Sequence, residues 1–492
     1  MATEIELKLS LSPAAARTLP QHPLLAAVTP VTHSLFNTYF DTPDLDFRRQ
    51  QVALRYRKRG REWLLTVKSA EPASGGLARR SEWETRGVPG QWDFGHVDDD
   101  SLRNRLERAI PQLAPIFTTH FRRTAWTFEY HGSCIEVALD RGQVASEGRQ
   151  ERICEVELEL VRGNVADLFA LASELQVTCP LFPAVASKAE RGYRLFAGLP
   201  SEPFKARAPG FSPDIPPVAA FQTVALSCLE QFQRNVPGIS AGTDPEYLHQ
   251  ARVALRRLRS ALKVFAPVLP DDFSRNWGDA WKILAASLGE ARNWDVFVAE
   301  TLPPLLEAFP EDHTSRRLMA AARRKAARSR NAVRRLLAAP ESPRLLLDFT
   351  AALVTLDPSG SATSSSEFAR GCLIRRARQA SRLARRPAAL GDSERHVLRI
   401  RCKKLRYTLE FFSCLLPARR LKPYLATLNQ LQDELGLIND HVTAIDLVAQ
   451  LPGKLPQGPV LGWLHGRHAL LIEELPEMLE TWLAQPAPWK RK

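Results

Sequence analysis

The sequence lacks several features that would assign it to a class at once. No apolar run approaches the roughly 18 residues that a membrane-spanning helix needs. The chain opens without a basic segment followed by an apolar one, so we expect no secretory signal peptide and no membrane partner. Its seven cysteines are odd in number, scattered and never spaced as CxxC. We therefore expect a reducing, cytoplasmic location, without a disulfide framework or a cysteine-based zinc site.

The glycine-rich phosphate loops of P-loop and dinucleotide-binding proteins are also missing, as is a recognisable serine–histidine–aspartate set. What is present is length: 492 residues with 45% hydrophobic content predict two or three domains with full cores. A segment with five prolines and no periodicity, 201–218, predicts a linker between them. Before the linker, short alternating runs predict strands; after it, long patterns rich in Leu, Ala and Arg predict helices.

Charge differs sharply between these two parts. The net charge of the chain is +13, and basic and acidic residues balance through residue 218, so the whole excess lies in the second part. An excess of this size predicts a polyanionic partner for the helical part. Charge alone does not choose among nucleic acid, a membrane surface and polyphosphate.

The predicted strands share a pattern that begins at the fourth residue. In the first strand Glu4, Glu6 and Lys8 alternate with apolar residues and would share one face. Arg55 and Arg57 follow in LRYR, Lys68 in TVK, and Glu155 and Glu157 in CEVELEL. Carboxylates suit a divalent cation, and Arg and Lys neutralise phosphate oxygens.

Two arrangements are compatible with this pattern. In a sandwich the charged faces would point to water, as charged positions on strands mostly do. In a barrel with a polar lumen they would point inward, and the apolar faces would lie beneath helices. The segregation of acidic and basic residues onto different strands favours the lumen.

The first 200 residues resemble the CYTH family, the triphosphate tunnel metalloenzymes. The resemblance rests on ExExK at 4–8, YFDT at 39–42, LRxR at 54–57, TVK at 66–68, RSEWE at 80–84, FRR at 121–123, LDRG at 139–142, the glutamates of 155–159 and SKAERGY at 187–193. It implies an eight-stranded antiparallel tunnel barrel with flanking helices, occupying 1–200. It further implies that a triphosphate binds across facing walls with Mg²⁺, or Mn²⁺ as the alternative.

The resemblance also implies a role for individual residues. The implied metal ligands are Glu4, Glu6, Asp140, Glu155 and Glu157. The implied substrate-binding cations are Lys8, Arg55, Arg57, Lys68, Arg80, Arg123 and Lys188, with Arg122 as the alternative to Arg123. Among all of these, Glu4, Glu6, Lys8 and Lys68 are the expected catalytic residues.

The helical part contains an internal duplication. Adding 147 to His249, Arg252, Arg256 and Arg259 gives His396, Arg399, Lys403 and Arg406, and the same shift relates Leu288-Gly289 to Leu435-Gly436. In each copy these four residues fall within roughly 80° of one helix face. A single stripe would be an ordinary solvated face, but two related stripes predict a shared basic groove. Basic helices at 316–335 and 375–386 would extend it into a channel.

This part resembles the CHAD family, in HxxRVxxRRLRS at 249–260, LGEARNWD at 288–295, HxxRxxxKKLRY at 396–407 and LGLIND at 435–440. The resemblance implies an all-α domain over 219–486, built from two pseudo-symmetric four-helix bundles at about 219–356 and 367–486. It implies that inorganic polyphosphate binds along the basic stripes. The sparse aromatic residues among the arginines argue against stacking of single-stranded nucleic acid.

The sequence thus predicts an α+β protein that hydrolyses inorganic tripolyphosphate to pyrophosphate and phosphate. Its helical domain would bind polyphosphate, with an association to polyphosphate granules. Two alternatives remain open: a tunnel that acts on a nucleotide or thiamine triphosphate, including as a cyclase, and a polyphosphate-binding protein whose barrel is idle.

Overall fold

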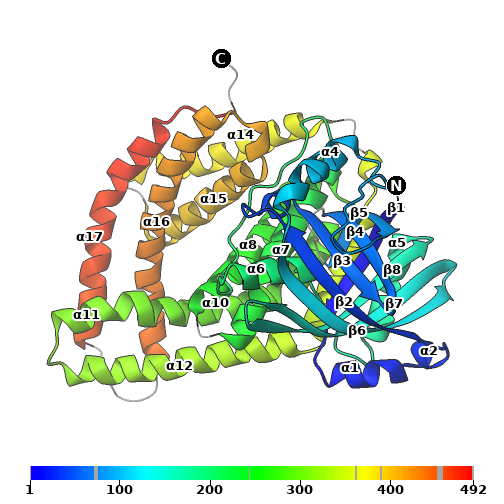
Figure 1. Ribbon diagram of the computed structural model, residues 1–492. Coiled ribbons are helices and arrows are strands. Elements are labelled where there is room, and N and C mark those ends of the chain that lie inside the picture. The colour runs from blue at the N-terminus through cyan, green and yellow to red at the C-terminus, as the bar shows by residue number, and fades with distance from the viewer. Residues whose placement is uncertain are drawn as a thin grey trace. The chain divides into compact units, whose positions relative to one another are not determined.

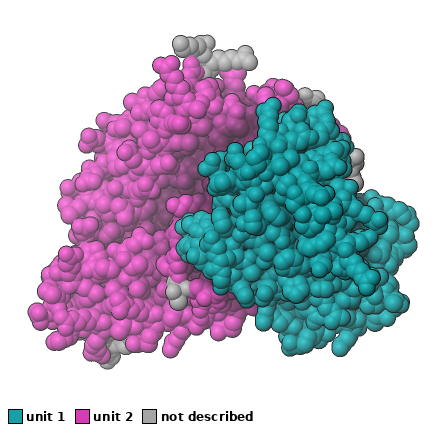
Figure 2. Space-filling model, in the orientation of Figure 1, with its two compact units in different colours: residues 1–203, 339–355 teal, residues 204–338, 356–492 magenta. Residues whose placement is uncertain are grey.

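The computed structural model describes residues 2–70, 76–242, 244–360, 363–387, 390–451 and 458–489. The chain divides into two compact units (Figure 2). Unit 1 contains residues 1–203 and 339–355, and unit 2 contains residues 204–338 and 356–492. No helix within the described residues is long and apolar enough to cross a membrane.

Unit 1 is built on a closed antiparallel barrel of eight strands (Figure 1). The strands are β1 (Ala2–Ser10), β2 (Val31–Asp41), β3 (Val52–Arg59), β4 (Glu62–Ala70), β5 (Leu77–Arg86), β6 (Ala114–Tyr130), β7 (Ser133–Ser146) and β8 (Arg149–Arg162). They pair in the order β5-β4-β3-β2-β6-β7-β8-β1, and β1 closes the ring by pairing with β5. A two-residue strand, β9 (Phe182–Pro183), also pairs with β1. The expected eight-stranded tunnel is confirmed.

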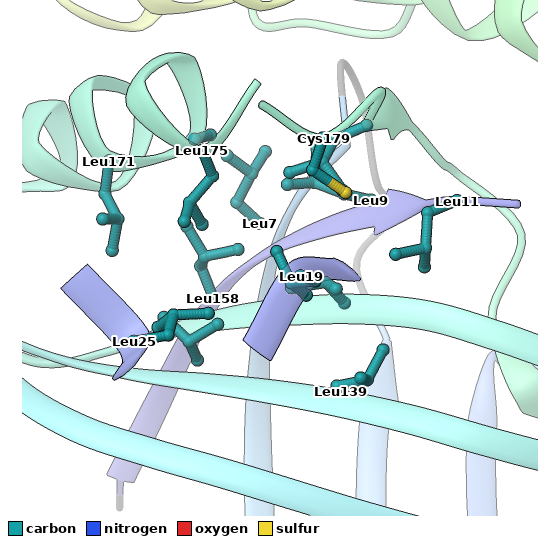
Figure 3. Packing of buried hydrophobic residues seen from close by; sticks show 14 of the residues in the cluster. Leu7, Leu9, Leu11, Leu19, Leu25, Leu139, Leu158, Leu171, Leu175 and Cys179 are labelled. Atoms are coloured by element: carbon teal, nitrogen blue, oxygen red, sulfur yellow. The ribbon is translucent and has the colours of Figure 1, made fainter. Parts of the chain in front are cut away.

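The apolar faces of the strands form the outside of the barrel and are covered by helices. On β1, Leu7 and Leu9 are fully buried and belong to one cluster with Leu158 of β8 (Figure 3). Leu171 and Leu175 of α5 (Val165–Leu175) pack onto the same cluster. The period of two along each strand therefore directs the alternate, charged positions into the lumen.

Six further α-helices complete the described part of unit 1. Five come from the first 200 residues: α1 (Ala15–Thr18), α2 (Pro23–Ala26), α3 (Asp46–Arg49), α4 (Asp100–Ala109) and, after α5, α6 (Lys188–Phe196). One more, α13 (Glu341–Val354), comes from far along the chain and packs against α5. Its Leu347 is fully buried in the cluster beneath α5. Residues 339–355 lie within the first expected helical repeat, yet they belong to unit 1.

All regular secondary structure among the described residues of unit 2 is helical. Its helices are α7 (Pro217–Ala241), α8 (Pro245–Phe265), α9 (Phe273–Ala280), α10 (Lys282–Val296), α11 (Leu302–Ala308), α12 (His313–Ala338), α14 (Ser365–Ala384), α15 (Asp392–Phe411), α16 (Ala418–Ala449) and α17 (Gly458–Leu483). The helix boundaries follow the offset of 147: shifting 245–265 gives 392–412, and α15 spans 392–411. Shifting α9 and α10 gives 420–443, which α16 spans as one uninterrupted helix.

Candidate active site

The lumen of the barrel contains a cavity of about 140 Å³ whose lining is mostly charged. Carboxylates from β1, β5 and β8 face cations from β1, β3, β4, β5, β6 and α6. The lining carboxylates are Glu4, Glu6, Glu82, Glu157 and Glu159, and the lining cations are Lys8, Arg55, Arg57, Lys68, Arg80, Arg123 and Lys188. All seven cations that the sequence singles out for phosphate therefore line one cavity.

The alternation on β1 delivers its three charged residues to this cavity. Glu6 and Lys8 are 3% and 4% exposed, so their charges are held almost entirely out of water. Lys8 Nζ lies 2.9 Å from Glu157 Oε1 and 3.8 Å from both Glu6 and Glu155. Burial alone would lower the pKa of Lys8, but the carboxylates of Glu157, Glu6 and Glu155 outweigh it and raise the pKa. Lys8 is therefore a permanent cation at the centre of the site.

Strands β3, β4 and β5 supply four of the lumen cations, Arg55, Arg57, Lys68 and Arg80. Lys68 Nζ lies 2.8 Å from Glu4 and 2.9 Å from Glu82, while Arg80 lies 3.0 Å from Glu6. Arg55 donates a hydrogen bond to the hydroxyl of Tyr39 at 3.1 Å. These pairs keep the cations in the lumen at low cost, since a buried charge without a partner is strongly unfavourable.

Arg57 is the least neutralised of these four cations. Burial, and then the charge of Arg55, lower the pKa of Arg57 to about 10. Its closest carboxylate, Glu84, is 3.6 Å away, and its Nε donates to Asn37 Oδ1 at 3.0 Å. An incoming anion would relieve the repulsion between the two arginines.

Only one of the two adjacent arginines on β6 points into the lumen. Arg123 lines the cavity and donates to both oxygens of Asp140, at 2.8 and 2.7 Å, whereas Arg122 is exposed. Adjacent strand residues point to opposite faces, so only one of the two can enter the lumen. Burial opposes the charge of Arg123, but Asp140 and Glu157 raise its pKa well above the ordinary value.

A cluster of three carboxylates lies at one side of the lumen. Oxygens of Asp140, Glu155 and Glu157 lie within 4.8 Å of one another. The ammonium group of Lys188 contacts all three, at 2.7 Å from Asp140 and 2.9 Å from Glu157, with Glu155 also paired. These hard oxygen donors fit a divalent cation of the Mg²⁺ type. Glu4 and Glu6 lie outside this cluster.

Lys188 is positioned by the motif that surrounds it. Ser187 caps α6 by accepting a hydrogen bond from the Glu190 amide, which places Lys188 at the first helical position. The same helix is tied to the barrel by Tyr193, whose hydroxyl donates to the buried Asp41 at 2.8 Å. Gly192 allows the close approach, because a Cβ there would lie 2.1 Å from the Phe117 ring. SKAERGY and YFDT thus act together to orient one lysine.

Sequence reasoning did not single out Glu159, Tyr39 or Glu82 as site residues, although all three line the cavity. Burial, followed by the charges of Glu4 and Glu136, raises the pKa of Glu159 to about 7. The strand period already placed Glu159 on the face of Glu155 and Glu157, so that signal was available.

Unit 2 contains a second charged cavity, of about 1170 Å³, lined by α8, α10, α15 and α16. Seven of the eight residues expected to bind polyphosphate line it: His249, Arg252, Arg256, His396, Arg399, Lys403 and Arg406. Arg259 is not among its lining residues, although its counterpart Arg406 is. The basic helices at 316–335 and 375–386, expected to extend a channel, contribute no lining residue either. Four cations that were not among the eight also line it: Lys205 and Arg207, and Arg257 and Arg292, which lie within the motifs at 249–260 and 288–295.

The cations of this cavity repel one another. Burial, and then Arg256, Arg399 and Arg252, lower the pKa of Lys403 to about 6. Burial and Arg256 lower the pKa of Arg252 to about 10, and burial with Arg292 lowers that of His249 to about 4. No carboxylate among the described residues pairs within 4.0 Å with Arg252, Arg399 or Lys403. Such crowding is the electrostatic condition for binding a polyanion.

Comparison with known protein families also divides the chain in two, although the second match includes residues 339–355, which belong to unit 1. Residues 2–193 match the family model of the CYTH domain, and residues 223–449 match that of the CHAD domain. The first match contains every charged residue of the lumen named above. The second contains His249, Arg252, His396, Arg399 and Lys403.

Individual relatives resemble separate parts of the chain. The inorganic triphosphatase of Haemophilus influenzae is 36% identical over 206 residues, which is 40% of this chain and 55% of that relative. The chain therefore spans about half the length of this curated relative. An uncharacterized protein of Mycobacterium tuberculosis is 28% identical over 92% of this chain and 89% of its own length. The crystal structure of the CHAD domain from Ricinus communis is 31% identical, with a TM-score of 0.50, and covers 58% of this chain and 98% of its own.

Proposed function

The chain is a CYTH domain followed by a CHAD domain, and from this premise we propose that it is a Mg²⁺-dependent inorganic triphosphatase that binds polyphosphate. The observation that carries the proposal is the lumen of the barrel. Seven cationic side chains and five carboxylates line one cavity of about 140 Å³. The relative named as an inorganic triphosphatase supports the same activity.

The cations would bind and orient the substrate. A triphosphate carries four or more negative charges at neutral pH, and Arg and Lys neutralise such oxygens without moving protons. Lys8, Lys188 and Arg123 keep their charge, because neighbouring carboxylates raise the pKa of each despite burial. Fixed cations of this kind stabilise the charge that develops on transferring phosphoryl oxygens.

The carboxylates would hold the metal. Asp140, Glu155 and Glu157 form the most compact donor set, and Glu6 contacts it through Lys8. A bound divalent cation supplies charge neutralisation at phosphoryl oxygens and lowers the pKa of water. Lys188 presently neutralises the three carboxylates, so we propose that its ammonium moves toward the phosphate when metal and substrate bind.

The cavity of unit 2 would bind polyphosphate. Its cations crowd together. Within the described part of the chain no carboxylate lies within 4.0 Å of Arg252, Arg399 or Lys403, and a polyanion would supply such partners. Binding there would concentrate phosphate chains near the catalytic domain that shares the polypeptide.

The test is phosphate release from tripolyphosphate, ATP, thiamine triphosphate and long polyphosphate, each with Mg²⁺ and with EDTA. We expect metal-dependent release from tripolyphosphate and little from the other three. Preferential release from ATP or thiamine triphosphate would contradict the inorganic substrate. Failure to release phosphate from every substrate, by folded protein, would favour an idle barrel.

A further inference from the structure

A second arginine surface lies on unit 2, separate from the cavity described above. Three hollows of about 980, 730 and 570 Å³ adjoin one another around α14 and the C-terminal segment 484–489. All three share Trp489, and none shares a residue with the large cavity. This is where the expected basic helix at 375–386 lies.

The hollows are lined by arginine with almost no acid. Six lining arginines are exposed and have no carboxylate within 4.0 Å among the described residues: Arg370, Arg378, Arg382, Arg385, Arg386 and Arg419. The sole acidic lining residue among those described is Glu367. Arg370, Arg378 and Arg382 fall within about 120° of one face of α14 and span about 18 Å along its axis. The surface is thus a linear track of unneutralised guanidinium groups.

The aromatic residues beside this track are already engaged. Trp489 packs edge-on against Tyr424, with ring centroids 5.5 Å apart, and Tyr424 also contacts Trp482. These rings anchor segment 484–489 to the core of the second helical half. Tyr424 and Trp482 are buried and Trp489 is partly buried, so the track offers few aromatic faces for stacking on bases, which is how single-stranded nucleic acids bind such surfaces. Concave hollows also suit a thin chain better than the convex face of a duplex.

We propose that this surface is a second binding site for inorganic polyphosphate, engaged only by chains long enough to occupy it together with the cavity. This inference rests on the proposed polyphosphate binding of unit 2. Short chains would bind in the cavity alone. Long chains would bind at both places, and the second contact, being intramolecular, would strengthen binding by avidity.

The test compares chains of about 10 and about 100 phosphates at matched salt, using the full-length protein. The variant Arg370→Ala/Arg378→Ala/Arg382→Ala/Arg385→Ala should bind the long chain about tenfold or more weakly. Its affinity for the short chain and its tripolyphosphatase activity should stay within about twofold of wild type. The matched control removes four exposed arginines of α12: Arg317, Arg323, Arg324 and Arg328.

Each other result overturns the proposal in a distinguishable way. Equal losses for both variants would mean a general effect of charge. Equal losses for long and short chains would mean that the surface is not a separate site. Loss of RNA or DNA binding with polyphosphate binding intact would assign the surface to nucleic acid. If the wild type bound the short chain but the α14 variant kept full affinity for the long one, this inference alone would fail. If the wild type bound neither chain, the proposed polyphosphate function would fail with it.

A second measurement needs no variant. Phenylglyoxal modifies exposed arginines, and peptide mass spectrometry locates the modified ones. The long chain should protect Arg378 and Arg382 from modification, and the short chain should not. Equal protection by both chains, or by neither, would overturn the proposal.

Discussion

Lys188 Nζ lies 2.7 Å from Oδ2 of Asp140, a carboxylate that is fully buried. The pair belongs to the compact carboxylate cluster, so the ammonium group neutralises the donors that a metal ion would need. Burial opposes the charged lysine, but Asp140, Glu155 and Glu157 outweigh it and raise its pKa. Metal and lysine therefore compete for the same oxygens.

The competition predicts opposite effects of Lys188→Met on metal and substrate. Without the ammonium, the three carboxylates repel one another and should bind Mg²⁺ more tightly, so half-maximal activity should need about one third or less of the wild-type metal concentration. The lost phosphate contact should raise KM for tripolyphosphate about tenfold or more. Steady-state titrations of metal at saturating substrate, and of substrate at saturating metal, separate the two. A higher metal requirement in the variant would contradict the competition.

Glu4→Gln with Glu6→Gln should separate catalysis from polyphosphate binding. Both residues line the lumen and pair with Lys68 and Arg80. Removing their charges should reduce kcat for tripolyphosphate about 10²-fold or more, while long-chain binding by unit 2 stays unchanged. Glu129→Gln, at an exposed position, is the matched control and should leave both unchanged. Parallel loss of hydrolysis and binding would show that the two activities are not separable.

Binding in the cavity of unit 2 should take up a proton. Burial and three neighbouring arginines lower the pKa of Lys403 to about 6, so this lysine is mostly neutral at pH 7 without an anion. A bound polyanion favours the charged form, so affinity should increase as the pH falls from 8 to about 6. Calorimetry in two buffers of different ionisation enthalpy measures the uptake directly. A buffer-independent enthalpy at pH 7 would contradict this expectation.

The same lysine should cost stability. Its pKa is about 6 in the folded protein against an ordinary value of 10.5, so between these values the unfolded chain binds more protons. The contribution of Lys403 to the free energy of unfolding is therefore least favourable near pH 6 and becomes more favourable as the pH rises from about 6 to 10.5. Lys403→Met removes a buried amine that must give up its proton on folding at pH 7, and should raise Tm at that pH by about 2–4 °C, the equivalent of about 1 kcal/mol. It should also weaken polyphosphate binding. A lower Tm in this variant would argue against electrostatic crowding.

Helix α13 should stabilise the barrel although it lies far along the chain. Leu347 is fully buried in the cluster with Leu7, Leu158 and α5, so Leu347→Ala should destabilise unit 1 by about 2–5 kcal/mol. Hydrogen exchange in peptides of β8 reports on this unit specifically. Leu470→Ala, at a position that is 59% exposed, is the control and should change stability by about 0.5 kcal/mol or less. Unaltered exchange in β8 would show that α13 contributes little.

The amino-acid sequence determined which residues share a face. A strand has a period of two, so the alternation of charged and apolar residues in strands such as ExExK at 4–8 shows which side chains share a face. A helix has a period of 3.6, so the basic residues repeated at an offset of 147 could likewise be assigned to one helix face in each copy. The motifs then indicated all seven cations that line the lumen. They also indicated eight residues for the cavity of unit 2, of which seven line it.

Only the tertiary structure decided where those faces point. The pairing of β1 with β5 closes the barrel, and closure turns the charged faces inward, which strand periodicity by itself leaves open. Arg259 and Arg406 occupy equivalent sequence positions, yet of the two only Arg406 lines the cavity, where it donates hydrogen bonds to Gln432 and Glu410. Helix α13 joins the barrel unit because its apolar face finds a complementary surface there, and long-range packing of that kind leaves no periodic mark in a sequence.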